Sequence, residues 1–494
     1  MKIGFDNSAY IQKQTEQILK RVSQWGQKLY LEFGGKLFDD YHAARVLPGF
    51  HVNGKIQLLY ALRESTEIII CINAADIEKS KMRADFGIPY DMDTLRLMDN
   101  IRRMGLYISS VVISQYRDQP AAELFYNKLE RRGERVYIHR PIAGYPVDVD
   151  HVVSDKGYGA NPYIETTRPL VVVTASGPGS GKMATCLSQL YHEHKRGISA
   201  GYAKFETFPV WNLPLNHPVN LAYEAATADL NDINAIDPFH LEAYGQTAVN
   251  YNRDIEVFPL VRNILAKIMG TDMVYQSPTD MGVNMVGHCI TDDEIVREAA
   301  KQEVVRRYFK TRCDYKEGCL GIDAVKKLEI TMKQLDIFPE YGLAVRPALE
   351  KAKQNNCPAM ALVLKDGRVV TGKTTDILTA ASSLILNSVK TLAGLPDELL
   401  LIAPFVLEPM LTLKREIFRD QHPQLRLEEV LNALSICAAT DPSAEECLSR
   451  LRQLRDCDAH SSHIISRSDK NALGKLGINV TCTPEFLSDD LYYN

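Results

Sequence analysis

The sequence lacks a hydrophobic run long enough to cross a bilayer, and it lacks an excess of either charge. Its longest apolar stretch, from Leu399 to Leu407, is interrupted at Pro404 and followed by Glu408, whereas a membrane-spanning helix needs about 20 consecutive apolar residues. The 494 residues include 57 Lys and Arg against 62 Asp and Glu, a formal net charge of −5. Such a chain has no general attraction to nucleic acid or anionic membranes, so we expect neither as a partner.

Two further absences concern cysteine spacing and the first residues of the chain. The ten cysteines include no C-x-x-C pair, which argues against a zinc ribbon or a thioredoxin-like site and favours reduced thiols. Asp6 and Asn7 stand where a signal peptide would need an apolar stretch. These observations predict a cytoplasmic protein.

The distribution of apolar and polar residues along the chain predicts a multi-domain α/β protein. At roughly 150 residues per domain, about three domains are expected, and changes in pattern place them at residues 1–165, 166–330 and 331–494. The first contains apolar runs that alternate with helical patterns, which is typical of a Rossmann-like parallel layer. Its predicted strands are residues 67–73, 106–114 and 135–139.

The other two regions carry their own signals. The second begins with predicted strands at residues 169–174 and 200–205 on either side of a helix, and it ends in a helical segment strongest at residues 292–309. In the third, Asp366 and Gly367 lie between two apolar runs, which predicts a β-hairpin over residues 359–373. A helix is predicted next, over residues 377–392.

The most informative motif is VVVTASGPGSGKMATCLSQL, residues 171–190, in which a buried strand leads through a glycine loop into a helix. Glycines allow successive backbone N–H groups to point at one ligand, and the helix N-terminus adds positive potential, so the arrangement favours phosphate. The residues expected to bind the phosphate compound are Gly177, Gly179, Ser180, Gly181 and Lys182.

The match to the P-loop pattern G-x-x-x-x-G-K-[ST] is incomplete. Ser176 occupies the first glycine position, and Met183 occupies the position of the hydroxyl that binds Mg²⁺. Two alternatives therefore stay open: a tight structural turn without a ligand, and a dinucleotide loop, although no G-x-G-x-x-G is present.

A lysine at the end of the next predicted strand supports the phosphate hypothesis. The segment KRGISAGYAKFETFP, residues 195–209, resembles the dethiobiotin-synthetase-like branch of P-loop proteins. In that branch a lysine on the second strand is aimed at the junction of nucleotide and substrate, and the resemblance implies this catalytic role for Lys204. The alternative is an exposed lysine at a strand end.

Residues 212–256 form a polar, loop-rich stretch dense in His, Asp and Glu. Carboxylates here could hold Mg²⁺ in place of the missing hydroxyl, and His240 or a carboxylate could act as a base. Asp237, His240 and Asp254 are the catalytic candidates of this stretch, and the alternative is a solvated loop with helix caps. His460 and His463 are not expected to bind a metal, because on a strand they would point to opposite faces.

Several segments together resemble one bacterial family of cytosolic proteins of similar length and unknown function. They include GFDNSAY, LEFGGKLFDDYHAARVLPGF, GYGANPYIETTRPLVVVTASGPGSGKMATCLSQLYHE and HPVNLAYEAATADLND. The hairpin ALVLKDGRVVTGK and the helix after it look like the cytidine-deaminase-like α/β layer. That helix, TAASSLILNSVKTLAG, has no Cys, His or Glu where the deaminase zinc would sit. The resemblance therefore implies a zinc-free domain for packing, oligomerisation or substrate binding.

These patterns predict a cytoplasmic enzyme that binds ATP or another phosphate compound, with Mg²⁺ as a second expected cofactor. Its chemistry would be phosphoryl transfer or ATP-dependent ligation on a small metabolite, and a homo-oligomer is expected. Two alternatives remain: an enzyme that acts on a phosphorylated metabolite without hydrolysing a nucleotide, and a non-catalytic protein that senses a nucleotide or serves assembly.

Overall fold

The computed structural model describes residues 2–83, 87–230, 232–271 and 275–488. The described residues divide into two compact units, one within residues 2–224 and 232–300 and the other of residues 225–230 and 301–488. Among the described residues, no helix combines the length and the apolar character needed to cross a membrane.

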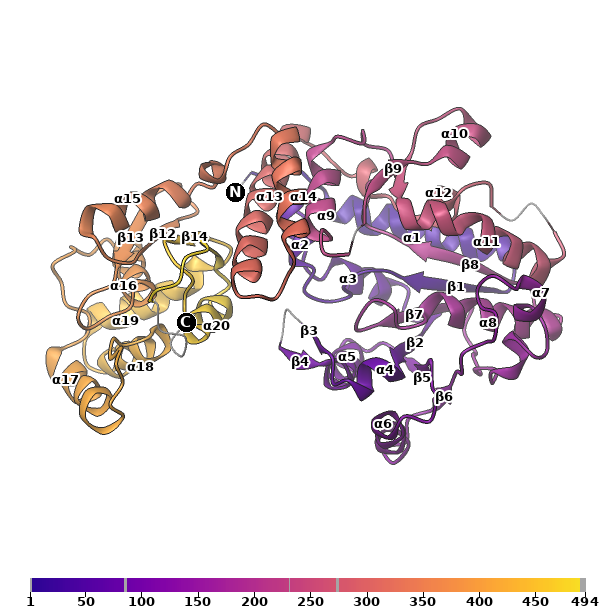
Figure 1. The fold of residues 1–494 in the computed structure, drawn as a ribbon, viewed down its shortest axis with the longest axis horizontal. Helices are drawn as coiled ribbons and strands as arrows, with labels where there is room; N and C mark the ends of the chain where they lie inside the picture. The colour runs from indigo at the N-terminus through magenta and orange to yellow at the C-terminus, as the bar shows by residue number, and fades with distance from the viewer. Residues whose placement is uncertain (1, 84–86, 231, 272–274, 489–494) are drawn as a thin grey trace. The chain divides into compact units, whose positions relative to one another are not determined.

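The first unit is built on a parallel sheet of seven strands (Figure 1), in the order β11-β8-β1-β7-β2-β5-β6. The strands are β1 (Lys28–Phe33), β2 (Thr66–Asn73), β5 (Ile108–Ser114), β6 (Val136–Ile138), β7 (Leu170–Ala175), β8 (Ala200–Phe205) and β11 (Gly282–Val283). The α/β prediction is confirmed, as are the five strands predicted between residues 67 and 205. Strands from both sides of residue 165 belong to this one sheet, and β1, which lies between β7 and β8, was not predicted.

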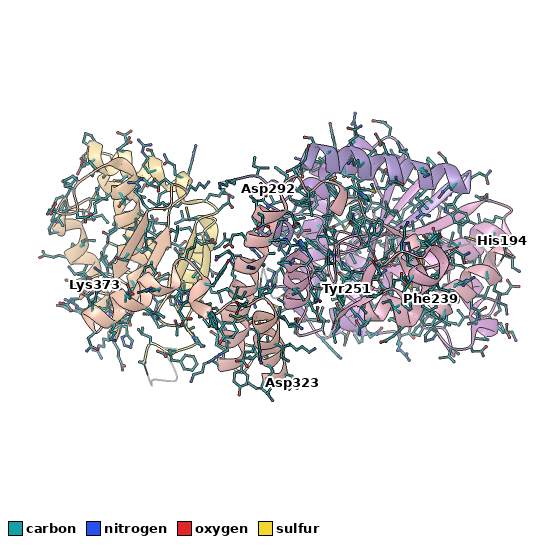
Figure 2. All side chains as sticks on the ribbon, turned by 90° about the horizontal axis from the view of Figure 1, so that it is seen from above. His194, Phe239, Tyr251, Asp292, Asp323 and Lys373 are labelled. Carbon is teal, nitrogen blue, oxygen red and sulfur yellow. The ribbon has the colours of Figure 1, made fainter. Side chains whose placement is uncertain are left out.

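Helices cover the sheet because its strands are apolar on both faces. On one face, α8 (Lys182–Lys195) and α11 (Asn252–Met269) share a core with Val171, Val173 and Tyr202 of the strands. The helix α1 (Asn7–Trp25) contacts β1 and β8. The last turn of α8 carries His194, labelled in Figure 2, beside other basic residues, which suits the negative end of the helix dipole.

The polar stretch 212–256 is more ordered than predicted. It contains α9 (Pro218–Ala226), the hairpin strands β9 (Asn234–Ile236) and β10 (Val249–Tyr251), and α10 (Pro238–Tyr244). Polar side chains stabilise these short elements by forming hydrogen bonds to their backbone. The Asp237 carboxylate caps α10 by accepting hydrogen bonds from the amides of Phe239 and His240, which is why the stretch is polar without being a solvated loop.

The second unit contains a separate mixed sheet in the order β13-β12-β14-β15. The predicted hairpin is confirmed as β12 (Ala359–Val363) and β13 (Val369–Lys373), and the helix after it is α16 (Ala380–Ala393). The sheet continues with β14 (Asp458–Ser461) and β15 (Asn479–Cys482), which pair in parallel. His460 lies on β14, and both of its ring nitrogens lie within hydrogen-bonding distance of threonine hydroxyls, those of Thr481 and Thr483.

Other helices of this unit stand beside the sheet. The long α13 (Asp293–Lys316), which begins in the first unit and continues into the second, agrees with the helical segment predicted at residues 292–309. Next to the hairpin lies α15 (Val345–Asn355), which contacts both β12 and β13. The apolar face of α16 joins the core of the unit, with Leu384, Ile385 and Val389 fully buried.

Candidate functional site

The carboxyl ends of the parallel strands bring the candidate residues to one edge of the first unit's sheet. The loop of residues 176–181 follows β7, and Lys204 is the fifth residue of β8. Open α/β sheets bind their ligands outside this edge. Because β1 lies between β7 and β8, the loop and Lys204 are separated by one strand.

The glycine loop follows a path that side chains would obstruct. Gly181 has a φ of +84° as the N-cap of α8, and a Cβ atom there would lie 2.8 Å from the Cβ of Ser114. A Cβ atom on Gly177 would lie 2.4 Å from the Tyr90 ring. A residue with a side chain would therefore displace the loop at either position.

Two polar side chains from neighbouring strands hold the loop by its carbonyl groups. The amide nitrogen of Asn73, the last residue of β2, donates to the carbonyl oxygen of Gly179 at 3.0 Å. The hydroxyl of Ser114, the last residue of β5, donates to the carbonyl oxygen of Ser180 at 2.8 Å. Both carbonyl groups are thereby turned toward the protein.

The backbone N–H groups of the loop are left available. Within the described residues, no acceptor is found for the amides of Gly179, Ser180 and Gly181 or of the first helical residues Lys182 and Met183. The buried hydroxyl of Ser180 likewise has no partner in this part of the chain. A helix start with free N–H groups and positive dipole potential is a site for an anion.

Lys182 is half-buried at the first position of α8, where the helix meets the loop. Within the described residues its ammonium forms neither an ion pair nor a hydrogen bond. It acts on the thiol of Cys71: burial raises the pKa of Cys71 to about 12, while Lys182 acts in the opposite direction. The Lys182 ammonium thus lies beside the loop, and no carboxylate of the described residues forms an ion pair with it.

A cavity of about 170 Å³ adjoins the loop and the start of α8. Its lining includes Ser114, Arg117, His139, Arg140, Tyr158 and Gly181. The Nε2 atom of His139 and the hydroxyl of Tyr158 are buried there without a hydrogen-bond partner among the described residues. Burial lowers the pKa of His139 to about 4, outweighing a hydrogen bond to the carbonyl group of Pro162 that raises it.

Lys204 stands in a cluster of carboxylates at the end of β8. Its ammonium forms ion pairs with Asp254, in the first turn of α11, and with Glu206 at 3.2 Å. Burial favours the neutral amine, but the carboxylates of Asp254, Glu206 and Glu32 together hold the pKa of Lys204 above its usual value. Lys204 is thus a permanent cation, and the structure brings it together with Asp254 as a pair.

Two carboxylates of this cluster were missed in the sequence. Glu32 pairs in register with Lys204 across β1 and β8 and accepts a hydrogen bond from the Tyr202 hydroxyl at 2.7 Å. Burial raises the pKa of Glu206, with Asp254 acting in the same direction and Lys204 against it. A carboxyl group with a raised pKa at a sheet edge is a candidate proton donor. The signal for Glu32 was a charged residue inside the apolar run KLYLEF.

Asp237 and His240 lie together on α10. The Asp237 carboxylate also accepts from the hydroxyl of Thr279 at 2.7 Å and from its amide at 3.2 Å, so it is fully buried among donors. The Nδ1 atom of His240 lies 3.0 Å from the hydroxyl of Ser277. No contact joins either residue to Lys204 within the described ranges, so the structure separates them from the Lys204 cluster.

The chain also carries no ready-made metal centre in the residues that the structure describes, since no three His, Cys, Asp or Glu side chains come together there as ligands would. Glu206 and Asp254 both face the Lys204 ammonium. The hydroxyl of Thr185, two residues beyond Met183, faces the Cys71 thiol at 3.5 Å. The side chain at the usual Mg²⁺ position is the thioether of Met183, which is a poor ligand for this ion.

Comparison with known proteins places the whole chain in one group. Residues 3–336 match the family described as "Domain of unknown function DUF1846, N-terminal", and residues 340–492 match "Domain of unknown function DUF1846, C-terminal". UPF0371 proteins of Clostridium botulinum (strain Alaska E43 / Type E3) and Clostridium tetani (strain Massachusetts / E88) are each 54% identical over 502 aligned residues. In both comparisons the alignment covers 100% of either chain.

Proposed function

The chain belongs to the DUF1846 family, so its activity must be inferred from its own site, and we propose that it is a cytoplasmic enzyme that binds a phosphorylated small metabolite. The phosphate group would rest on the loop of residues 176–182. The observation that carries this proposal is the contrast between two kinds of backbone group in the loop. The carbonyl groups of Gly179 and Ser180 accept from Asn73 and Ser114, while the N–H groups of residues 179–183 have no acceptor among the described residues.

The free groups around the loop match the chemistry of a phosphate. Four or five N–H groups can donate to phosphate oxygens, and Lys182 adds a positive charge that forms no ion pair with a carboxylate of the described residues. The Ser180 hydroxyl offers one more donor. The cavity beside the loop, with His139 and Arg140 in its lining, would hold the rest of the metabolite. Its volume of about 170 Å³ is below the ~300–1,000 Å³ of pockets that enclose larger ligands, which favours a small substrate.

The reaction itself would use the Lys204 cluster on β8, which lies across the loop from the cavity beside β5, so the reacting group would be at the phosphate end of the metabolite. Lys204 would stabilise negative charge that develops on the substrate, and Glu206, with its raised pKa, would donate or accept a proton. Asp254 and Glu32 would keep Lys204 charged and in place. Asp237 and His240 are assigned a positioning role, because the carboxylate of Asp237 ties α10 to Thr279.

A nucleotide is the second candidate ligand. It is favoured by the order of strand, glycine loop, lysine and helix, which resembles P-loop proteins, and by Lys204 in the position implied by the dethiobiotin-synthetase-like resemblance. Mg²⁺ would then be bound by the nucleotide's own phosphates with Glu206 or Asp254 nearby. We infer for the second unit a zinc-free deaminase-like layer, supported by the hairpin followed by α16, which offers no Cys, His or Glu.

Isothermal titration calorimetry of the full chain tests the proposal. Inorganic phosphate, pyrophosphate and glucose 6-phosphate would be titrated in parallel with ATP, with and without Mg²⁺. We expect the metal-free phosphate compounds to bind. Binding of ATP alone, and only with Mg²⁺, would favour the second candidate, and no binding of any of them at millimolar concentration would overturn both.

Matched variants locate the ligand. Lys182→Ala should weaken phosphate binding at least tenfold, which is about 1.4 kcal/mol, while Lys195→Ala, at the exposed far end of the same helix, should leave it unchanged. Gly181→Ala should abolish binding because a side chain collides with Ser114. Lys204→Met should keep phosphate binding and lose turnover of any metabolite found active in a panel.

A further inference from the structure

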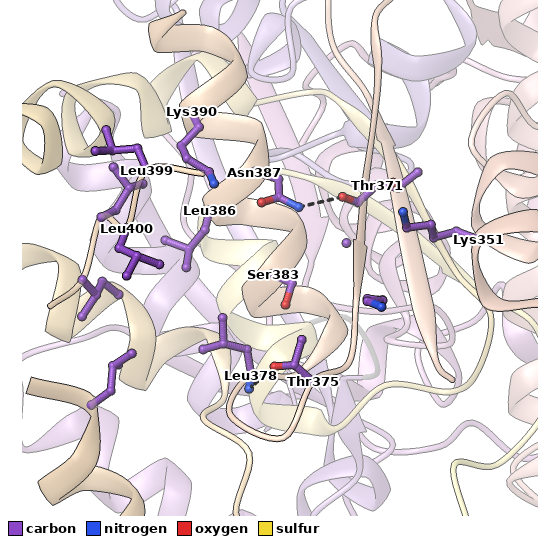
Figure 3. A pocket seen from close by; sticks show the side chains of 15 residues that line it. Lys351, Thr371, Thr375, Leu378, Ser383, Leu386, Asn387, Lys390, Leu399 and Leu400 are labelled. Carbon is purple, nitrogen blue, oxygen red and sulfur yellow. Dashed lines mark hydrogen bonds between the residues drawn. The ribbon is translucent and has the colours of Figure 1, made fainter. Parts of the chain in front are cut away.

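A groove of about 330 Å³ lies along α16 in the second unit, apart from the proposed phosphate site (Figure 3). Residues from one stripe of α16 form its floor: Ser383, Leu386, Asn387 and Lys390. Their spacing of three and four residues puts them on one helix face. Residues 399–407 contribute to one wall, and β13 and α15 contribute to the other.

One side of the groove is apolar. Its residues are Leu378, Leu399, Leu400, Leu401, Ile402 and Leu407. Leu400 is 68% exposed, so this wall presents hydrocarbon to solvent. Covering such a surface is favourable by roughly 25 cal/mol per Å² removed from water. The groove therefore suits a ligand with an apolar part.

The other side of the groove is cationic. Lys351 and Lys373 line it, Lys390 lies on the floor, and no Asp or Glu side chain is among the lining residues. Within the part of the chain that the structure describes, none of the three lysines forms an ion pair. Since three lysines and no carboxylate line the groove, an anion is the ligand that its charge favours.

Of the three lysines, Lys390 gives the strongest indication of an anionic ligand. Its residue is only 7% exposed, and its ammonium donates to one neutral acceptor, the carbonyl oxygen of Asp397 at 2.6 Å. An ammonium group has three donors, and burying it without a counter-charge is costly. A bound carboxylate would supply the missing acceptor and the missing charge at once.

Ser383 gives an independent sign of a ligand. It is 9% exposed, and its hydroxyl has no hydrogen-bond partner among the described residues. The amide nitrogen of Asn387, by contrast, is already used by the carbonyl oxygen of Thr371 at 2.9 Å. A buried hydroxyl without a partner on the floor of a cavity is explained if a polar ligand atom or an ordered water lies against it.

We propose that this groove binds an amphipathic carboxylic acid, whose carboxylate meets Lys390 and whose apolar part covers the leucine wall. A monoanion fits better than a phosphate ester, because a single buried ammonium balances one charge and a dianion would lose more hydration on entering an apolar groove. Lys351 and Lys373 would strengthen binding from the opposite wall.

Calorimetric titration of the full chain with three probes of equal chain length tests the charge and the apolar part separately. Octanoate should bind. Octan-1-ol should bind at least tenfold more weakly, and octylamine should not bind. Equal binding of octanoate and octan-1-ol would overturn the proposal, as would the absence of octanoate binding at millimolar concentration.

Variants complete the test. Lys390→Met keeps the length of the side chain and removes its charge, so octanoate should bind at least tenfold more weakly. The variant should remain folded, because the substitution removes a buried cation and leaves none unpaired. Leu399→Trp should reduce binding of octanoate and octan-1-ol alike by filling the groove. Lys353→Met, on the exposed side of α15, is the control and should change nothing. Octanoate affinity unchanged by Lys390→Met would refute the assigned contact, and phosphate binding by the first unit should be unaffected in every variant.

Discussion

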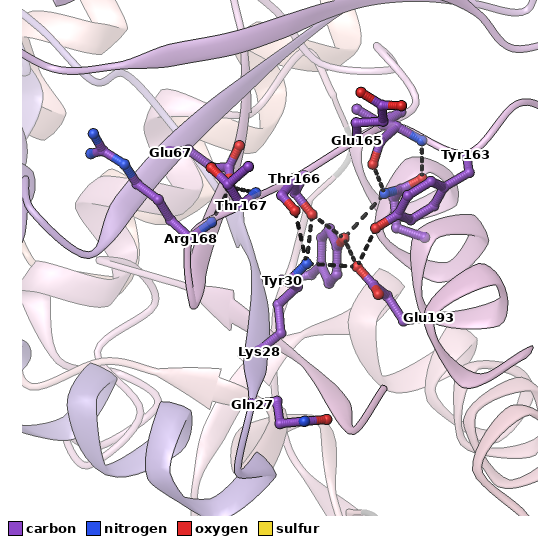
Figure 4. Close-up of polar contacts among 12 residues, drawn as sticks. Gln27, Lys28, Tyr30, Glu67, Tyr163, Glu165, Thr166, Thr167, Arg168 and Glu193 are labelled. Atoms are coloured by element: carbon purple, nitrogen blue, oxygen red, sulfur yellow. Dashed lines mark hydrogen bonds and ion pairs between the residues drawn. The ribbon is translucent and has the colours of Figure 1, made fainter. Parts of the chain in front are cut away.

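The amino and carboxyl ends of the strands form two edges of the seven-stranded sheet, each built around a lysine. Only the amino edge is complete in charge, because its buried cation and carboxylate pair with each other. At the amino edge, Lys28 of β1 donates to the Glu193 carboxylate of α8 at 2.9 Å (Figure 4). The hydroxyls of Tyr30 and Tyr163 donate to the same carboxylate oxygen, at 2.7 and 3.1 Å. One buried cation faces one buried carboxylate, and the surrounding hydroxyls come from the protein itself.

The carboxyl edge has a different balance. Lys204 faces three carboxylates, and Lys182 faces none of the described ones. The glycine loop has free N–H groups, and the hydroxyls of Ser180 and Tyr158 and the Nε2 atom of His139 are buried without partners in the described chain. The difference teaches that buried charge alone does not mark a site. At the amino edge the buried charges of Lys28 and Glu193 pair with each other, although the Oε2 atom of Glu193 has no partner among the described residues. At the carboxyl edge the Lys182 cation has no carboxylate partner among the described residues, and a ligand could supply one.

The largest effect is expected when Lys28, the cation of the amino edge, is removed. Lys28→Met leaves the Glu193 carboxylate buried without its counter-charge, so we expect a loss of about 3–5 kcal/mol in the free energy of unfolding. Urea denaturation followed by circular dichroism measures it. The protein that remains folded should bind phosphate as the wild type does. A loss below 1 kcal/mol would mean that the amino edge is no more complete than the carboxyl edge.

The second prediction uses pH to expose an incomplete group at the carboxyl edge. The pKa of His139 is lowered from 6.5 to about 4 by burial, so below pH 6.5 the unfolded chain takes up a proton that the folded chain does not. The contribution of His139 to stability is therefore complete above pH 6.5 and falls as the pH drops toward 4, by up to roughly 3 kcal/mol.

Unfolding in urea at pH 7 and pH 5 checks this. The difference in stability between the wild type and His139→Asn should shrink from pH 7 to pH 5, because the variant no longer titrates. His194→Asn, at an exposed position on α8, is the control and should show no such change. A difference that is the same at both pH values would contradict the assigned pKa.

The contrast between the edges also explains which parts of the fold were predictable. Strands β2, β5, β7 and β8 are local apolar runs, and the glycine loop is a local pattern, so the sequence sufficed for them. Strand β1 was missed although it lies inside the sheet, because Lys28 and Glu32 interrupt its apolar pattern. Both charged side chains find their partners far along the chain, Lys28 in Glu193 and Glu32 in Tyr202. The local hydrophobic pattern cannot indicate such distant partners.

The candidate site was predictable to the same extent. The loop and Lys204 could be proposed from the sequence because the loop follows one recognisable strand, β7, and Lys204 lies near the end of another, β8. The side chains that orient the loop, Asn73 and Ser114, end strands far away in sequence, and their role depends on strand order. The polar stretch 212–256 was predicted to supply catalytic acids. Its Asp254 pairs with Lys204, whereas the carboxylate of Asp237 caps α10 and accepts a hydrogen bond from Thr279.

The smallest expected effect comes from comparing two hydroxyl groups, that of Ser180 at the carboxyl edge and that of Thr166 at the amino edge. Ser180→Ala removes a buried hydroxyl that has no partner among the described residues, so stability should change by less than about 0.5 kcal/mol. Phosphate affinity should fall about three- to tenfold as one donor is lost. Thr166→Val removes a hydroxyl that accepts from Lys28 at 2.8 Å. It should cost about 1 kcal/mol of stability and leave phosphate affinity unchanged. Denaturation and calorimetry on both variants give the four values. If Ser180→Ala lost stability and kept affinity, its hydroxyl would serve the fold, and the carboxyl edge would be complete without a ligand.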